Sequence, residues 1–200
     1  MARRCGHFKI SIAGVLVLGV STLTGCTSES KGDPPELASG FCWGAFSRPL
    51  VQKYLTPDSK VSTKVDSPFD LYNGKAYRSC LVYADGNTVF SASAERIDTG
   101  GAPVEESVTW KTATGHRKKR INVGNVGAMA KNTAVSVITC TPPSSFNPSK
   151  TSPPKSEKNI LLRVDLRPAD KGAQSDADVI SLLRDFVNFT QGSFDCQPAR

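Results

Sequence analysis

The residues of this sequence most able to do chemistry are its six cysteines, and the spacing of four of them predicts crosslinks rather than a metal site. These four are Cys42, Cys80, Cys140 and Cys196, separated by 38, 60 and 56 residues. Structural zinc sites usually present cysteines in closely spaced pairs, and no Cys-x-x-Cys occurs here. An even number of cysteines, four, in an exported chain predicts two disulfides, for which three pairings exist. We favour Cys42–Cys80 and Cys140–Cys196, because each bridge would then join neighbouring elements within one half of the chain.

The start of the chain predicts export. A basic head within the first nine residues, which includes Arg3 and Arg4, precedes an apolar run at residues 10–23. This run is shorter than the ~20 residues that a membrane-spanning helix needs, and it is typical of the core of a signal peptide. The run closes on the motif Leu23, Thr24, Gly25 and Cys26. The motif resembles a bacterial lipobox, in which an aliphatic residue and two small residues precede a cysteine.

The resemblance to the lipobox implies that the Cys26 thiol receives a diacylglyceryl group and that the signal is cut in front of it. Residues 1–25 would then be removed, residues 26–40 would form a lipidated, flexible tether, and residues 41–200 would form one domain. Two alternatives stay open: an ordinary cleavable signal with a coincidental cysteine, and an uncleaved anchor. Arg3-Arg4 also leaves the twin-arginine route open beside the general secretory route.

Composition places the rest of the chain among ordinary globular domains. The 200 residues carry 25 Lys plus Arg against 18 Asp plus Glu, a formal charge of +7, and 38% are hydrophobic. These values exclude a collagen, a wholly disordered chain, a polytopic membrane protein and a large multidomain enzyme.

No catalytic constellation is evident, so we predict that the protein is not an enzyme. The one histidine after the signal, His116, lies among four cations, where a precisely positioned base is hard to build. The motifs G-x-S-x-G and H-E-x-x-H do not occur. Glu105 and Glu106 would point in opposite directions if they began a strand, and Asp176 and Asp178 are explained as residues of a helix start. No metal or other cofactor is expected.

A basic cluster follows Trp110 and consists of Lys111, Arg117, Lys118, Lys119 and Arg120. It could contact anionic material of the cell envelope, such as lipid headgroups, an anionic wall polymer or an acidic partner. The alternative, which we favour, is a solvated hairpin tip that discourages aggregation. Nucleic acid is not an expected partner, because no aromatic residues are interspersed in the cluster to stack on bases.

Periodicity predicts an α+β domain, with an antiparallel sheet packed on one face by two helices. One helix begins after Ser47, with Pro49 in its first turn. The other begins after Ser175, where Asp178 would complete a capping pair, and ends at Gly192. The expected strands are residues 77–84, 88–96, 107–112, 121–126, 134–140 and 159–167. Residues 85–87, Asp-Gly-Asn, predict the turn between the first two strands, and strand 107–112 would pair with strand 121–126.

Taken together, these features resemble small actinobacterial lipoproteins of uncharacterised function. The resemblance rests on Cys42-Trp43 before a short helix, a cysteine in the first hairpin, Gly124 and Gly127 before a strand that ends in Cys140, and a closing helix near Cys196. It implies an exported, lipid-anchored and non-catalytic protein. We therefore expect a binding or interaction module on the extracytoplasmic face of the cell membrane, held there by Cys26. Its partner would be an envelope protein or an anionic wall polymer, and the alternative is a hydrolase that acts on wall material.

Overall fold

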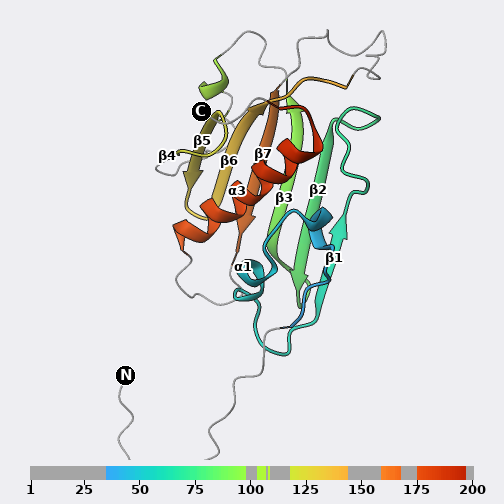
Figure 1. The fold of residues 1–200 in the computed structure, drawn as a ribbon. Coiled ribbons are helices and arrows are strands. Elements are labelled where there is room, and N and C mark those ends of the chain that lie inside the picture. Colours follow the sequence, from blue (N-terminus) through green and yellow to red (C-terminus); the bar gives the residue numbers. More distant parts are fainter. Residues whose placement is uncertain are drawn as a thin grey trace, which may run out of the picture. The chain divides into compact units, whose positions relative to one another are not determined.

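The domain is built on a seven-stranded antiparallel sheet, in the order β1-β2-β3-β7-β6-β5-β4 (Figure 1). The computed structural model describes residues 35–97, 103–106, 108, 118–143, 159–167 and 175–196. Within these residues the strands are β1 (Val61–Val65), β2 (Tyr77–Ala84), β3 (Asn87–Ile97), β4 (Lys119–Ile121), β5 (Val126–Ala130), β6 (Thr133–Thr139) and β7 (Asn159–Leu166). The predicted α+β class, with an antiparallel sheet and two disulfides, is confirmed.

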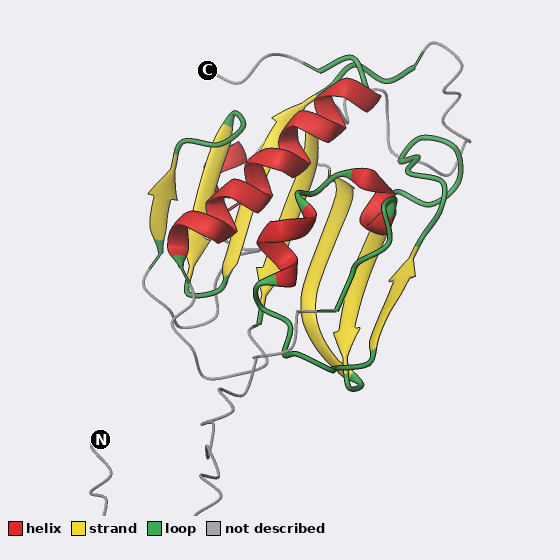
Figure 2. Ribbon diagram, turned by 60° about the horizontal axis from the view of Figure 1, so that its bottom comes forward, coloured by secondary structure: helices red, strands yellow, loops and turns green. Residues whose placement is uncertain are grey.

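Three helical elements lie on one face of the sheet, which we call the inner face (Figure 2). They are the short 3-10 turn η1 (Phe41–Gly44), α1 (Arg48–Gln52) and the long α3 (Asp176–Ser193). The apolar stripe of α3 is buried against the sheet and consists of Val179, Leu182, Leu183, Phe186 and Val187. Gly192 does not end α3 as predicted, since the helix continues through Ser193.

The last strand, β7, joins two three-stranded meanders into one sheet. Strands β1 to β3 follow one another in space, as do β4 to β6, and β7 lies between β3 and β6. Along β7 every second side chain faces the core: Ile160, Leu162, Val164 and Leu166 are each fully buried on the inner face. The opposite side chains include Leu161 and Asp165, and both are also buried. The outer face is therefore partly covered.

Both disulfides have the pairing that we favoured. Cys42–Cys80 fastens η1 to β2, and Cys140–Cys196 fastens the end of β6 to the residues that follow α3. They close sequence separations of 38 and 56 residues, each of which gives about 4 kcal/mol of stabilisation on the chain-entropy account. All four cysteines are used in these crosslinks, so they do not form a metal site.

The turn between β2 and β3 is confirmed, although it is tighter than predicted. Asp85 and Gly86 both have positive φ, at 49° and 80°, and Asn87 already belongs to β3. Left-handed backbone at both central residues is typical of a two-residue hairpin, because its twist matches that of the strands. Asp-Gly is one of the few dipeptides that adopts it readily.

The strand predicted at residues 107–112 is wrong where the structure describes it. Residues 104–106 and 108 are helical, and residues 109–112 lie outside the described residues. Val104 and Val108 are four residues apart, so a helical turn presents both on one side, and they pack on the outer face beside Leu161. The strand predicted at residues 121–126 also differs, because β4 ends at Ile121, a turn follows, and β4 pairs with β5 instead.

The predicted helix caps are wrong in detail. Ser47 and Ser175 occupy the N-cap positions of α1 and α3, but neither side chain caps its helix. Asp178 instead accepts a short hydrogen bond from the Tyr54 hydroxyl and pairs with Lys53, so these groups fasten α3 to the end of α1. An ion pair between elements has replaced the local capping pair that the sequence suggested.

The packed part of the chain begins before the predicted tether ends. Leu37 is 1% exposed and belongs to the main core, whereas the tether was predicted to extend through residue 40. Arg48 also donates a hydrogen bond to the Leu37 carbonyl oxygen at 3.4 Å. This leucine is the only large apolar residue of the predicted tether, and its burial in the core offsets the cost of ordering the chain around it.

Candidate functional site

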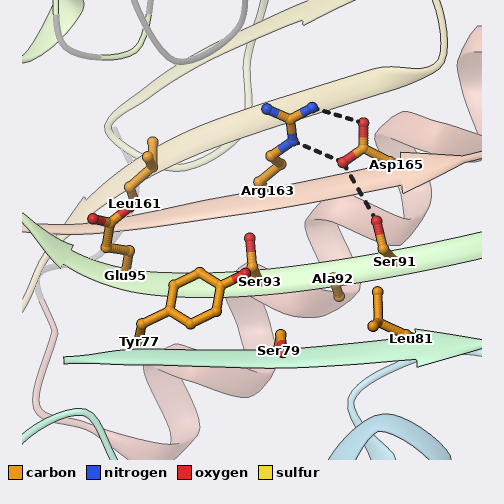
Figure 3. Close-up of a pocket in the computed structure, with 10 residues that line it drawn as sticks. All are labelled: Tyr77, Ser79, Leu81, Ser91, Ala92, Ser93, Glu95, Leu161, Arg163 and Asp165. Atoms are coloured by element: carbon orange, nitrogen blue, oxygen red, sulfur yellow. Dashed lines mark hydrogen bonds and ion pairs between the residues drawn. The ribbon is translucent and has the colours of Figure 1, made fainter. Parts of the chain in front are cut away.

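A hollow of about 330 Å³ opens on the outer face of the sheet, across β2, β3 and β7 (Figure 3). The residues that line it are Tyr77, Ser79 and Leu81 from β2, Ser91, Ala92, Ser93 and Glu95 from β3, and Leu161, Arg163 and Asp165 from β7. Its size lies at the lower end of the range of small-molecule sites, roughly 300–1,000 Å³. We take it as the candidate functional site.

The hollow exists because short side chains meet in register between long ones. Ser79 pairs with Ser93 across β2 and β3, and Ser93 pairs with Arg163 across β3 and β7. Side chains at paired positions lie on the same face of a sheet, so the two serines form a low floor. Tyr77 and Leu161 are longer and lie in the next row, paired through Glu95, where they form one rim.

An ion pair between the half-buried Arg163 and the buried Asp165 closes the other end of the hollow. Arg163 contacts Asp165 through two nitrogens, Nε at 2.7 Å and an Nη at 3.0 Å. Asp165 also accepts a short hydrogen bond from Thr133 on β6 and a long one, 3.4 Å, from Ser91 on β3. Figure 3 shows the guanidinium and the carboxylate directed at each other. These contacts fasten three adjacent strands, β3, β7 and β6, on the outer face.

The carboxylate of Asp165 stays ionised in this setting. Burial alone would raise its pKa, but the hydrogen bonds from Arg163 and Thr133 outweigh that effect and hold the pKa below its ordinary value. The same carboxylate raises the pKa of the Arg163 guanidinium. A carboxylate held ionised by an arginine is a poor general acid, so its arrangement indicates a structural clamp.

We expect Asp165→Asn to lower the free energy of unfolding by about 1–3 kcal/mol at pH 7, because the variant leaves Arg163 without its charged partner. The folded-state pKa lies below the unfolded value of ~3.9, so the carboxylate stabilises the fold above that value, and the contribution is lost as pH falls through the folded pKa. Urea unfolding from pH 7 to pH 3 measures it: the gap between variant and wild type should narrow in acid. Asp58→Asn, at an exposed position, is the control. A gap that is the same at every pH would contradict this account.

The two carboxylates of the hollow lie far apart. Glu95 pairs with Leu161, whereas Asp165 pairs with Ser91, four residues along the strands. Four residues of extended chain span about 13 Å. Glycoside hydrolases place their two carboxyl groups roughly 5–10 Å apart, with one of them free to transfer a proton. The two carboxylates of the described lining therefore do not have the spacing of such a pair, and Asp165 is held by Arg163.

The basic cluster is described only in part. Lys111 and Arg117 lie outside the described residues, as does His116, whereas Lys118, Lys119 and Arg120 are exposed at the start of β4. These three residues belong to an edge strand and its approach, not to the hairpin tip that we predicted. Two of them face acids: Lys119 Nζ lies 3.8 Å from Asp176, and Arg120 lies 3.0 Å from Glu105. Charged side chains on an edge strand oppose unwanted pairing with another chain.

The acidic residues considered as catalytic candidates are on two separate helical segments. Glu105 and Glu106 are on the helical turn at residues 104–106, and Glu105 pairs with Arg120. Asp176 is at the first turn of α3. In the described part of the chain no three His, Cys, Asp or Glu side chains come together as metal ligands would.

The lipobox residues Leu23, Thr24, Gly25 and Cys26 lie outside the described residues, so the structure places none of the predicted attachment site.

The hollow was not predicted from the sequence. The alternation of Ser91, Ser93 and Glu95 with buried alanines was visible in the sequence and marks one polar face. What it did not show is which strands lie beside β3.

Comparison of the chain with protein-family models, with curated proteins and with solved structures gave no match. Among the described residues, no helix combines the length and the apolar character needed to cross a membrane.

Proposed function

We propose that this protein is a lipid-anchored binding module, held on the extracytoplasmic face of the cell membrane by acyl chains on Cys26. The observation that carries the proposal is the combination of a lipobox with a domain whose four cysteines all enter disulfides. Disulfides persist in oxidising compartments, which supports export. Two or more acyl chains hold a protein firmly at a bilayer, so the anchor needs no second element.

A binding role, rather than catalysis, is supported by the outer face of the sheet. Its hollow offers hydroxyl groups and an aromatic ring, and its ionised carboxylate is held by Arg163. A hydrolase of wall material, the alternative, would need a carboxylate free to donate or accept a proton, and Asp165 is not one. The exposed basic residues at β4 support a further contact of the same module with an anionic wall polymer or an acidic envelope protein.

Replacement of the Cys26 sulfur by oxygen tests the anchor. We expect Cys26→Ser to abolish acylation and to move the protein from the membrane pellet to the soluble or secreted fraction of the cells. Cys5→Ser is the matched control, because that cysteine would leave with the signal, and it should pellet like wild type. A Cys26→Ser protein that still pellets like wild type, and still carries lipid, would overturn the proposal.

A further inference from the structure

The chemistry of the hollow on β2, β3 and β7 narrows the class of ligand, given the proposed function of a binding module. The Tyr77 ring is 47% exposed at one rim, and Ser79 and Ser93 form a half-buried floor beside it. In the described part of the chain, neither the Ser93 hydroxyl nor the Tyr77 hydroxyl makes a hydrogen bond. An aromatic face next to open hydroxyl groups suits a ligand that has both apolar C–H faces and polar groups.

The serine hydroxyls provide both donors and acceptors. Ser79 donates its proton to Asp66 Oδ2 at 2.8 Å, which leaves the lone pairs of its oxygen free to accept. Ser93 can donate and accept, because its hydroxyl is not engaged by the described protein. Together the two hydroxyls can both donate and accept, which is complementary to a ligand that is itself rich in hydroxyl groups. A ligand with acceptors alone would leave part of this capacity unused.

The charges that line the hollow disfavour an anion. Among the described residues of the lining, Glu95 and Asp165 are acidic and Arg163 is basic, and the Arg163 guanidinium is bonded twice to Asp165. With two acids against one base, the described lining has a negative formal charge, which disfavours an anionic polymer. We assign any contact with an anionic polymer to Lys118, Lys119 and Arg120, at the start of β4.

The backbone of the hollow is not open to a peptide strand. Strands β2, β3 and β7 each pair with a neighbour on both sides, so their amide and carbonyl groups are used within the sheet. Recognition of extended peptides by strand addition needs a free edge. A ligand on this face must be held by side chains alone.

We propose that the hollow binds a ring of a neutral saccharide. The Tyr77 ring packs on the C–H face of the sugar, and the hydroxyls of Ser79 and Ser93 exchange hydrogen bonds with its hydroxyl groups. Leu161 extends the same rim on β7, and the pair of Arg163 with Asp165 closes the far end. In a module held next to the membrane, this site binds glycans of the cell wall or envelope.

The test uses the full, acylated chain in detergent micelles and an array of neutral and anionic glycans, followed by calorimetric titration with the disaccharides maltose, cellobiose and chitobiose. We expect saturable binding of neutral glycans. Tyr77→Ala should weaken it by about tenfold or more, and Ser93→Phe should abolish it by filling the floor. Tyr77 is exposed enough for its truncation to leave the fold intact, so the test stands even if Ser93→Phe fails to fold.

Matched controls are Tyr83→Ala, on the same strand but outside the hollow, and Ser62→Phe, an exposed serine of β1. Both should bind like wild type. No saturable binding of any neutral glycan, stronger binding of anionic glycans, or binding unaffected by Tyr77→Ala would each overturn the assignment. If glycan binding fails while Cys26→Ser still releases the protein from membranes, the ligand assignment alone is wrong. If Cys26→Ser still pellets and still carries lipid, the anchor is wrong whatever the glycans show.

Discussion

Phe186→Ala is expected to lower the free energy of unfolding by about 3–5 kcal/mol. Phe186 is fully buried at the middle of α3. Its ring stacks on Trp43 with centroids 5.9 Å apart, and lies 5.1 Å from Phe46 and 5.9 Å from Phe69. Truncation removes all three contacts and leaves a cavity between α3, η1 and the sheet, because a rigid core collapses only partially around a missing ring. Urea unfolding followed by tryptophan fluorescence measures the loss.

Phe189→Ala is the matched control, since Phe189 is on the same helix, is half-buried and contacts Phe69 at 5.0 Å. It should cost clearly less than Phe186→Ala. Phe186→Leu, which keeps most of the apolar volume, should fall between the two and stays measurable if the alanine variant does not fold. Equal losses for Phe186→Ala and Phe189→Ala would show that the cluster is not organised around Phe186.

The second large effect is expected at Gly124, in the turn between β4 and β5. Gly124 has φ of +68°, and a Cβ placed on it would lie 2.0 Å from Ser136 Oγ and 3.1 Å from the Val137 carbonyl oxygen. Ser136 is fully buried and donates to the Val123 carbonyl oxygen at 2.7 Å. Gly124→Ala would strain the backbone, crowd the core and break this hydrogen bond. We expect a loss of about 3 kcal/mol or more in the free energy of unfolding.

Gly86→Ala separates backbone strain from crowding. Gly86 has a similar φ of +80°, but no atom lies within 4 Å of an added Cβ. It should therefore lose only about 1 kcal/mol. Adding Ser136→Ala to Gly124→Ala removes the atom in the clash, so the double variant should lose less than the sum of the two single variants. Strict additivity in chemical denaturation would contradict the contact between these two residues.

The parts of the fold that follow from local pattern were predictable. Asp85-Gly86 fixes a hairpin through its own backbone preference, and β7 shows its inner face by strict alternation. The apolar stripe of α3 is set by helical spacing in the same way. In each case the information lies within a short window of sequence, so no knowledge of neighbours in space is needed.

Where the local sequence pattern is compatible with two structures, contacts with distant elements decide between them. Val108 and Trp110 alternate as in a strand, but Val104 and Val108 also lie four residues apart, and contact with Leu161 on the outer face stabilises the helical choice. Asp178 could have capped α3, yet Tyr54 and Lys53 engage it. A single sequence cannot rank these contacts, because the partners come from distant elements.

The hollow could not be predicted from the sequence for the same reason. Its floor depends on Ser79, Ser93 and Arg163 lying in one row across three strands. Two of these strands are joined by a hairpin, but β7 arrives from the other end of the chain and is inserted beside β3. Sequence alternation marks which side chains share a face of one strand, and it does not give the order of the strands.

The measurement that tests the central claim most directly is the intact mass of the protein extracted from cell membranes. The account predicts a chain that begins at Cys26, carries a diacylglyceryl modification there, and has no thiol that reacts with an alkylating reagent, since the other four cysteines are in disulfides. An unmodified Cys26, a mature chain that begins elsewhere, or free thiols at the four domain cysteines would contradict it.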